Sequence, residues 1–261
     1  MTMRIAVAGA TGRVGRHVVD VLAERGHDVV PISRATGVDV VTGRGLAPAL
    51  EGVDAIVDAA TGPSPDEREA TAFFEAAGRN LQDAGGRAGA SRIVVASIIG
   101  CDLFAGGYGR AKVVHERISL AGPVPARILR ASQFHEFVEQ LVAWGTRDGV
   151  AHVTAMRMQP VAARAVAEAV ADLATDPGDD APEIGEIAGP REERFARIAE
   201  LLVARLGDSV RIEEAAGPSD PYASLHETGA LLPGPGALLA GPTFEEWLDA
   251  TYPVALSRAT R

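Results

Sequence analysis

The sequence predicts an α/β protein whose centre is a doubly wound parallel sheet. One observation is a glycine-rich stretch, residues 9–15, that follows a short apolar run and opens a helical pattern of apolar residues. The other is the alternation of strand-length apolar runs with helical patterns as far as residue 129. Such alternation implies right-handed crossovers between parallel strands, with helices on both faces of the sheet. Both observations together predict a Rossmann fold.

The expected elements follow in chain order. Strands are expected at residues 4–8, 28–32, 38–41, 55–59, 92–96 and 126–129. A brief helix is expected at 47–50, a long one at 65–84 that ends at Gly85 and Gly86, and another at 111–120. Beyond these, the pattern predicts helices at 134–144, 161–173, 192–206 and 244–250, and strands at 184–187 and 210–213.

This organisation predicts two parts. Residues 1–150 form the expected nucleotide-binding domain. Residues 151–261 are expected to complete the sheet and to form a small C-terminal substrate lobe, because ligands of open α/β sheets bind beyond the carboxyl ends of the strands. The boundary near residue 150 is approximate.

Each glycine of the turn has a steric reason in a dinucleotide-binding site. Gly9, Gly12 and Gly15 would permit a tight turn, let the backbone approach a pyrophosphate, and let the helix pack on the strand. The phosphates would lie against free N–H groups at the helix N-terminus. The turn therefore predicts a nucleotide cofactor.

Composition narrows the class of protein. The chain of 261 residues has a net charge of −10 and its arginines are scattered, so we expect no nucleic-acid partner. Cys101 is the only cysteine and the histidines lack metal-ligand spacing, so we expect no metal site. We expect no signal peptide, and no apolar run approaches the roughly 20 residues of a membrane span. A cytoplasmic protein is the expectation.

Cofactor choice is indicated at the end of the second strand. An acidic residue there would favour NAD, but the chain has Ser33 and Arg34, whose hydroxyl and cation suit the 2′-phosphate of NADP. Arg13, inside the glycine turn, is placed to reach the same phosphate. The alternative is that both arginines are ordinary surface residues. We predict that NADP(H) is preferred over NAD(H).

The candidate catalytic residues are Tyr108, Lys112 and Ser97. Tyr108 and Lys112 are one helical turn apart, so their side chains share a face, and a nearby ammonium would lower the pKa of the phenol. Tyr108 could then protonate a carbonyl oxygen as hydride arrives, while Ser97, at the end of the preceding strand, donates to the same oxygen. Lys112 could also hold the nicotinamide ribose. An ordinary surface pair is the alternative explanation of the Tyr-x-x-x-Lys match.

These motifs resemble one known family. The turn at 9–15, the segment 95–100, the stretch 108–112 and the segment 128–134 together resemble the NmrA-like, NAD(P)H-binding branch of the atypical short-chain dehydrogenase/reductases. Segments 158–162 and 241–248 also look like bacterial members of that branch. The resemblance covers nearly the whole chain and implies a Rossmann fold and a nicotinamide cofactor.

The resemblance also implies positions for the cofactor. By position, it implies that phosphates contact the turn, the adenosine end lies at Ser33 and Arg34, and adenine and ribose lie along the segment after the fourth strand. The nicotinamide would lie near the segment after the sixth strand. The implied residues are Gly9, Thr11, Gly12, Arg13, Val14 and Gly15, then Ala60, Thr61 and Gly62, and finally Ser132, Gln133 and Phe134.

His135 is a candidate for a substrate pocket, or else it begins a helix and satisfies loop carbonyls.

Two functions remain open. The first function is an NADPH-dependent oxidoreductase that reduces a ketone, quinone or enone of a small molecule. The second is a non-catalytic NADP(H)-binding redox sensor that acts through a protein partner. Retention of Tyr108 and Lys112 favours the enzyme, because a sensor needs no proton donor.

Overall fold

The computed structural model describes residues 1–176, 181–215 and 222–253. They divide into two compact units. The first unit contains residues 1–131, 163–187 and 234–238, and the second contains 132–162, 188–233 and 239–261. The units therefore interleave along the chain, where the sequence predicted a single boundary near residue 150. Residues 163–187 return to the first unit because they supply a helix and a strand that pack on the central sheet.

The first unit is built on a seven-stranded sheet, whose order is β12-β9-β5-β4-β3-β1-β2. The pairs formed by β1 with β2 and β3, by β4 with β3 and β5, and by β5 with β9 are all parallel. Its strands are β1 (Arg4–Ala8), β2 (Asp28–Ile32), β3 (Ala55–Asp58), β4 (Arg92–Ile98), β5 (Ala126–Ala131), β9 (Ile184–Ala188) and β12 (Leu238–Leu239). The predicted doubly wound α/β sheet is confirmed.

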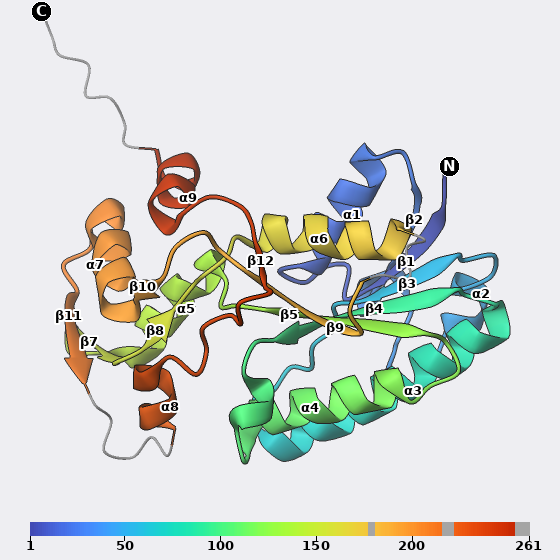
Figure 1. Cartoon of the computed structure of the whole chain (residues 1–261), viewed down its shortest axis with the longest axis horizontal. Helices are drawn as coiled ribbons and strands as arrows, with labels where there is room; N and C mark the ends of the chain where they lie inside the picture. The colour runs from blue at the N-terminus through green and yellow to red at the C-terminus, as the bar shows by residue number, and fades with distance from the viewer. Residues whose placement is uncertain (177–180, 216–221, 254–261) are drawn as a thin grey trace, which may run out of the picture. The chain divides into compact units, whose positions relative to one another are not determined.

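Helices cover both faces of this sheet. Figure 1 shows α1 (Gly15–Glu24) and α6 (Ala163–Thr175) on one face, and α3 (Glu67–Ala88) and α4 (Gly107–Leu120) on the other. The short α2 (Leu46–Ala49) packs against α3, and two single-turn 3-10 helices lie at Arg34–Thr36 and Cys101–Leu103. β1 and β3 are buried along their apolar residues, as strands covered on both faces should be. Strand order reverses between β1 and β3, which places the topological switch point beside the glycine turn.

Two predicted details of this unit are wrong. Residues 38–41 form no strand; instead the amide of Asn80 donates to the carbonyl oxygens of Val40 and Val41 at 2.9 and 2.8 Å, which holds this segment as a loop. The long helix does not end at Gly85 and Gly86 but continues to Ala88. A methyl group on Gly85 would lie 2.7 Å from Ile56 Cδ1, so this glycine lets the helix approach the sheet closely.

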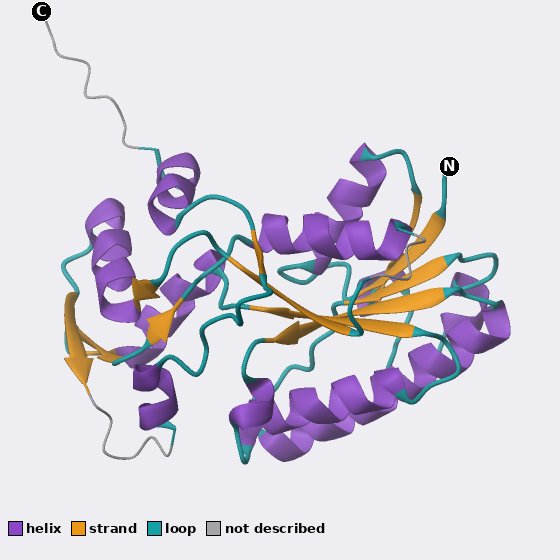
Figure 2. Cartoon of the chain, viewed as in Figure 1, coloured by secondary structure: helices purple, strands orange, loops and turns teal. Residues whose placement is uncertain are grey.

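The second unit consists of shorter elements (Figure 2). Its helices are a 3-10 turn at His135–Phe137, α5 (Val138–Gly145), α7 (Phe195–Leu206), α8 (Ala223–Thr228) and α9 (Phe244–Thr251). Its strands are β6 (Thr146–Arg147), β7 (Val150–Thr154), β8 (Arg157–Met158), β10 (Glu193–Arg194) and β11 (Arg211–Ala215). They form a three-stranded sheet, β11-β7-β6, and the antiparallel pair β10-β8. The four helices expected after residue 130 are present, counting α6 of the first unit, whereas β6, β7, β8 and β10 were not foreseen.

Candidate functional site

The glycine turn follows β1 at the switch point of the sheet. Gly9 has φ +77°, a left-handed conformation that favours glycine, and its N–H donates to the carbonyl of Ile32 at the end of β2 (3.0 Å). A methyl group on Gly9 would lie 2.6 Å from the carbonyl oxygen of Ala59. The backbone therefore turns sharply between two neighbouring strands, as a tight-turn glycine should.

The other two glycines differ in their surroundings. A methyl group on Gly15 would lie 2.1 Å from the carbonyl oxygen of Gly9, so the first turn of α1 packs directly on the loop. Gly12 is exposed, and the nearest atom to its virtual methyl is the Gly9 carbonyl oxygen at 3.1 Å. The helix begins there with no side-chain cap on Val14 and no acidic residue in its first turn. The N–H groups of Gly12 and Arg16 are bonded to the carbonyls of Gly9 and Gly12 (2.8 and 3.2 Å), and the positive end of the helix dipole favours an anion beside the turn.

The end of β2 presents an arginine. Ser33 and Thr36 cap each other around the 3-10 turn Arg34–Thr36, since each side chain accepts from the other's backbone N–H (3.3 and 3.0 Å). The Ser33 hydroxyl is thus engaged in shaping the turn, and the Arg34 side chain is exposed. The cation suits a phosphate contact at the end of this strand.

The segment after β3 is fixed by a buried carboxylate. Asp58 Oδ1 accepts from the backbone N–H of Ala60 at 3.0 Å, and both residues are buried. Thr61 is exposed, and Gly62 packs so closely on Phe73 that a methyl group would lie 3.0 Å from the ring. The predicted adenine-binding residues therefore form a short, tightly held stretch beside the glycine turn.

Tyr108 lies in the first turn of α4 and is half-buried against Phe74, with ring centroids 5.8 Å apart. The helix begins at Gly107, whose N–H donates to Glu67 Oε2 from α3 (2.8 Å). Burial raises the pKa of Tyr108 to about 12. This direction is opposite to the predicted lowering, because no contact of the described chain brings an ammonium to the phenol.

Lys112 points elsewhere. Its Nζ donates to the carbonyl oxygen of Ala96 in β4 (2.8 Å) and lies 3.0 Å from Nδ1 of His115. It also lies 4.6 Å from the centre of the Phe74 ring, a cation–π distance. Burial lowers the pKa of Lys112 to about 8, although the charge of Asp58 favours the ammonium.

Ser97 belongs to a different buried cluster. Its hydroxyl donates to Glu116 Oε1 (2.5 Å), and Glu116 also accepts two hydrogen bonds from Arg130 at 3.0 and 2.8 Å. Burial opposes ionisation of Glu116, but these hydrogen bonds outweigh it and hold its pKa below the usual value. No hydrogen bond within the described ranges joins Ser97, Tyr108 and Lys112 to one another. The three residues share one region of the first unit without forming a hydrogen-bonded trio.

Sequence reasoning missed two buried residues of this region. His115 Nε2 lies 2.9 Å from Asp58 Oδ2, and His115 is completely buried. Their signals were present: Asp58 ends an otherwise apolar strand, and His115 follows Lys112 by three residues, on the same helical face. A buried polar residue in a strand needs a partner, and that requirement could have identified the pair.

The remaining predicted residues lie in the second unit. Ser132 is buried and its hydroxyl donates to the Gln133 side chain (3.2 Å), while Phe134 forms a parallel bridge with Val161. His135 begins the 3-10 turn, and its Nε2 lies 3.1 Å from the carbonyl oxygen of Pro242. This contact agrees with the alternative in which His135 begins a helix and satisfies a loop carbonyl. Roles of these four residues in nicotinamide or substrate binding therefore rest on the sequence pattern.

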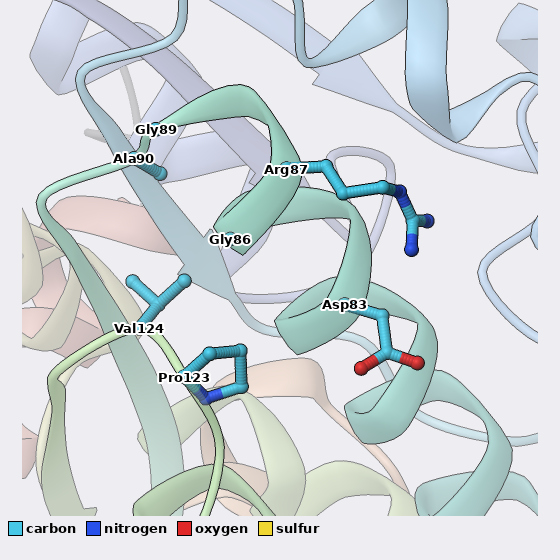
Figure 3. Close-up of a pocket in the computed structure, with 7 residues that line it drawn as sticks. All are labelled: Asp83, Gly86, Arg87, Gly89, Ala90, Pro123 and Val124. Atoms are coloured by element: carbon cyan, nitrogen blue, oxygen red, sulfur yellow. The ribbon is translucent and has the colours of Figure 1, made fainter.

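A surface hollow lies at the end of the central sheet opposite the glycine turn. It is lined by Asp83, Gly86, Arg87, Gly89, Ala90, Pro123 and Val124, and its volume is about 460 Å³ (Figure 3). These residues come from the end of α3 and the loop that precedes β5, whereas the glycine turn follows the carboxyl end of β1. The hollow is therefore separate from the candidate cofactor site.

The described parts of the chain contain no group of three or more His, Cys, Asp or Glu side chains arranged to hold a metal ion. Among those residues, no helix is both long and apolar enough to span a bilayer.

Comparison with known proteins decides the family. The profile of a family described as NAD(P)H-binding matches residues 9–177, which is more than half of the chain. The chain belongs to this NAD(P)H-binding family. The matched region includes the glycine turn, the end of β2, the segment after β3 and the start of α4. The NAD(P)H-binding family expected from the sequence is confirmed.

Solved structures of two reductases in complex with NADP or NADPH share the fold of this chain. A dTDP-4-dehydrorhamnose reductase from Bacillus anthracis, in complex with NADP, is 16% identical, with a TM-score of 0.73 over 95% of this chain and 98% of the other. The NADPH-dependent quinone oxidoreductase QOR2 from Escherichia coli, complexed with NADPH, is 17% identical, with a TM-score of 0.68 over 95% and 99%. At such identities the likeness concerns the fold alone.

One curated relative matches part of the chain. The photosystem II assembly factor Ycf39 of Synechocystis is 32% identical over 111 residues, which cover 37% of this chain and 34% of the relative. The chain thus spans about a third of that relative's length in the match.

Proposed function

We propose that this NAD(P)H-binding protein is an NADPH-dependent reductase of a ketone, quinone or enone group in a small molecule. The observation that supports the cofactor most directly is the glycine turn at the switch point. Methyl groups on Gly9 and Gly15 would overlap backbone atoms at 2.6 and 2.1 Å, and one on Gly12 would lie 3.1 Å from the Gly9 carbonyl oxygen. The exposed Arg34 at the neighbouring strand end supports the phosphorylated cofactor.

The chain's own residues have distinct tasks in this proposal. Thr11, Gly12, Arg13 and Val14 bind the pyrophosphate through the start of α1, and Arg34 binds the 2′-phosphate. Ala60, Thr61 and Gly62 lie along adenine and its ribose. Bound NADPH supplies the hydride for reduction of the carbonyl or enone group. Lys112 has one ammonium donor beyond those aimed at Ala96 and His115, and that donor binds the nicotinamide ribose.

Tyr108 is the proposed proton donor. Because burial raises its pKa to about 12, the phenol stays protonated at neutral pH and can donate to an oxygen that becomes more basic as hydride arrives. Ser97 is the proposed second donor, which requires its hydroxyl to leave Glu116 when substrate binds. Tyr108 therefore carries the acid role without help from Lys112.

One observation favours a second candidate function. The hydroxyl of Ser97 and the ammonium of Lys112 are both committed to internal partners, namely Glu116 and the pair Ala96 and His115. A cofactor site whose Ser97 and Lys112 groups are occupied by internal partners would also suit a redox sensor. Such a sensor binds NADP(H) without turnover and acts through a protein partner. The enzyme and the sensor differ in whether Tyr108 matters.

The test is steady-state oxidation of NADPH with a panel of quinones, ketones and enones. For an accepted substrate, Tyr108→Phe should lower kcat by about 10²- to 10⁴-fold and leave NADPH affinity unchanged. Tyr252→Phe is the matched control, because its hydroxyl bonds to Glu139 in the second unit and kcat should not change. Equal kcat in wild type and Tyr108→Phe would contradict the acid role. Absence of turnover, with unequal NADPH and NADP⁺ affinities, would favour the sensor.

A further inference from the structure

Lys112 is the only lysine of the chain, since the other 24 of its 25 basic Lys and Arg residues are arginine. It is also buried, with 3% of its surface exposed. Arginine keeps its proton under all ordinary conditions, whereas a buried lysine readily changes its pKa. The ammonium of this one lysine is therefore buried inside the first unit, where α4 brings it to the Ala96 carbonyl of β4.

A histidine joins this ammonium to a carboxylate. Lys112 Nζ lies 3.0 Å from His115 Nδ1, and His115 Nε2 lies 2.9 Å from Asp58 Oδ2. An ammonium can only donate, so Nδ1 accepts and the ring proton resides on Nε2, which donates to Asp58. The imidazole is thus neutral and lies between one positive and one negative charge.

The pair Asp58 and His115 is shielded from water. Asp58 and His115 are 1% and 0% exposed, and the Phe74 ring stacks on the imidazole with centroids 4.6 Å apart and planes at 16°. The same ring lies beneath Lys112 Nζ. Charges act strongly across such a dry environment.

Other titratable groups near Lys112 have their own partners or stay neutral. On α4, Glu116 is paired with Arg130, although its charge also favours the Lys112 ammonium, and Tyr108 keeps its proton. Cys101, from the 3-10 turn after β4, is buried with its pKa raised to about 11. From α3 the facing residues are Phe74 and Gly78, which carry no charge. Asp58 is then the carboxylate linked to Lys112 by hydrogen bonds.

We propose that Asp58 and His115 are positioning residues for Lys112. The neutral imidazole links the Asp58 carboxylate to the Lys112 ammonium by hydrogen bonds, and it holds the ammonium against the Ala96 carbonyl. The consequence for ribose binding rests on the proposed function; the arrangement itself does not. Hydrogen bonds from His115 and Ala60 hold the pKa of Asp58 low despite burial. Burial and the charge of Lys112 lower the pKa of His115, which keeps the imidazole neutral.

The single lysine makes a direct test possible. Full-length protein labelled with ¹³C at lysine Cε gives one side-chain lysine signal, whose shift is followed by NMR against pH. The wild-type midpoint is expected near 8, as burial lowers the pKa of Lys112 to about 8. In Asp58→Asn the ammonium loses the carboxylate that favours it most, and the midpoint should fall by about one pH unit.

Two further variants separate positioning from general loss of packing. His115→Gln retains an acceptor for Lys112 and a donor for Asp58, so its midpoint should lie between those of wild type and Asp58→Asn. Ser119→Ala is the matched control, since it removes a buried hydrogen bond to the His115 carbonyl (2.9 Å) on the same helix without touching the imidazole. Its midpoint should equal that of wild type.

Either of two results would overturn the proposal. One is a wild-type midpoint near the ordinary lysine value of about 10.4. The other is a midpoint unchanged in Asp58→Asn, or, should that variant not fold, a midpoint for His115→Gln that lies above the wild-type value. The titration needs no cofactor, so failure of NADPH to bind would reject the proposed function and leave this result standing.

Discussion

The Ser97 hydroxyl donates to the Glu116 carboxylate, which reaches it from the adjacent helix α4 across the end of β4. The same carboxylate holds Arg130 through two hydrogen bonds and accepts from the thiol of Cys101 at 3.4 Å. Glu116 therefore gathers residues of β4, β5 and the turn after β4 around one negative charge. Glu116 lies on the same helix as Lys112, four residues later, and its charge also favours the Lys112 ammonium, but its hydrogen bonds go to Ser97, Cys101 and Arg130.

Removing that charge should destabilise the first unit. In Glu116→Gln, the Arg130 side chain, only 12% exposed, would lose its buried partner and retain Asp102 at 3.1 Å. We expect the free energy of unfolding to fall by about 3 kcal/mol, as for other buried pairs that lose one member. Urea unfolding measures this. Asp102→Asn is the control, and its exposed carboxylate should be worth less than about 1 kcal/mol; equal losses in both variants would contradict the central role of Glu116.

Acid should act through the same carboxylate. The pKa of Glu116 is held below its usual value, so the unfolded chain binds its proton first as pH falls. Its contribution to stability is present above the unfolded pKa of about 4.3 and is lost as pH falls through the lower folded pKa. Urea unfolding at pH 7, 5 and 3.5 should therefore show a smaller loss of stability in Glu116→Gln than in wild type. Parallel pH profiles for the two proteins would refute this assignment.

The contact between Gly15 and Gly9 makes a steric prediction. In Gly15→Ala the new methyl would meet the Gly9 carbonyl oxygen at 2.1 Å, so the turn must shift. We expect a loss of about 1–3 kcal/mol of stability and weaker NADPH binding, because the N–H groups at the start of α1 move with the turn. Gly236→Ala is the control, since its methyl meets no atom within 4 Å. An unchanged NADPH affinity in Gly15→Ala would argue against the turn as the phosphate site.

Much of the first unit could be predicted because local pattern and tertiary role agree there. The strands β1, β3, β4 and β5 are covered on both faces, so their apolar runs are visible in the sequence. Residues 38–41 look like a strand, yet the side chain of Asn80, forty residues away, bonds their carbonyls. The two-residue strands of the second unit carry no periodicity that could reveal them.

The candidate site shows the same contrast. The glycine turn and Arg34 are local features, and their order along the chain placed them beside one another. The orientation of Lys112 depends on Asp58, 54 residues earlier, and on the carbonyl of Ala96, neither of which its spacing from Tyr108 reveals. Spacing on a helix fixes which face two residues share, but burial decides where a flexible side chain points.

Arg34 should determine the preference between the two cofactors. Arg34→Ala removes the exposed cation at the end of β2, and a lost charged hydrogen bond of about 1.5–3 kcal/mol corresponds to roughly a 10- to 100-fold weaker NADPH affinity. NADH affinity should hardly change, because NADH lacks the 2′-phosphate. Arg87→Ala alters net charge equally at the other end of the sheet and should leave both affinities as in wild type. An equal loss of NADPH affinity in the two variants would mean that Arg34 acts only through the net charge of the protein.

Calorimetric titration of the full-length protein with NADPH, and separately with NADH, is the most direct test of a cofactor site at the glycine turn. We expect one binding site per chain, with NADPH bound at least about tenfold more tightly than NADH, which corresponds to about 1.4 kcal/mol. If neither nucleotide binds, the glycine turn serves the fold alone and the cofactor site is refuted.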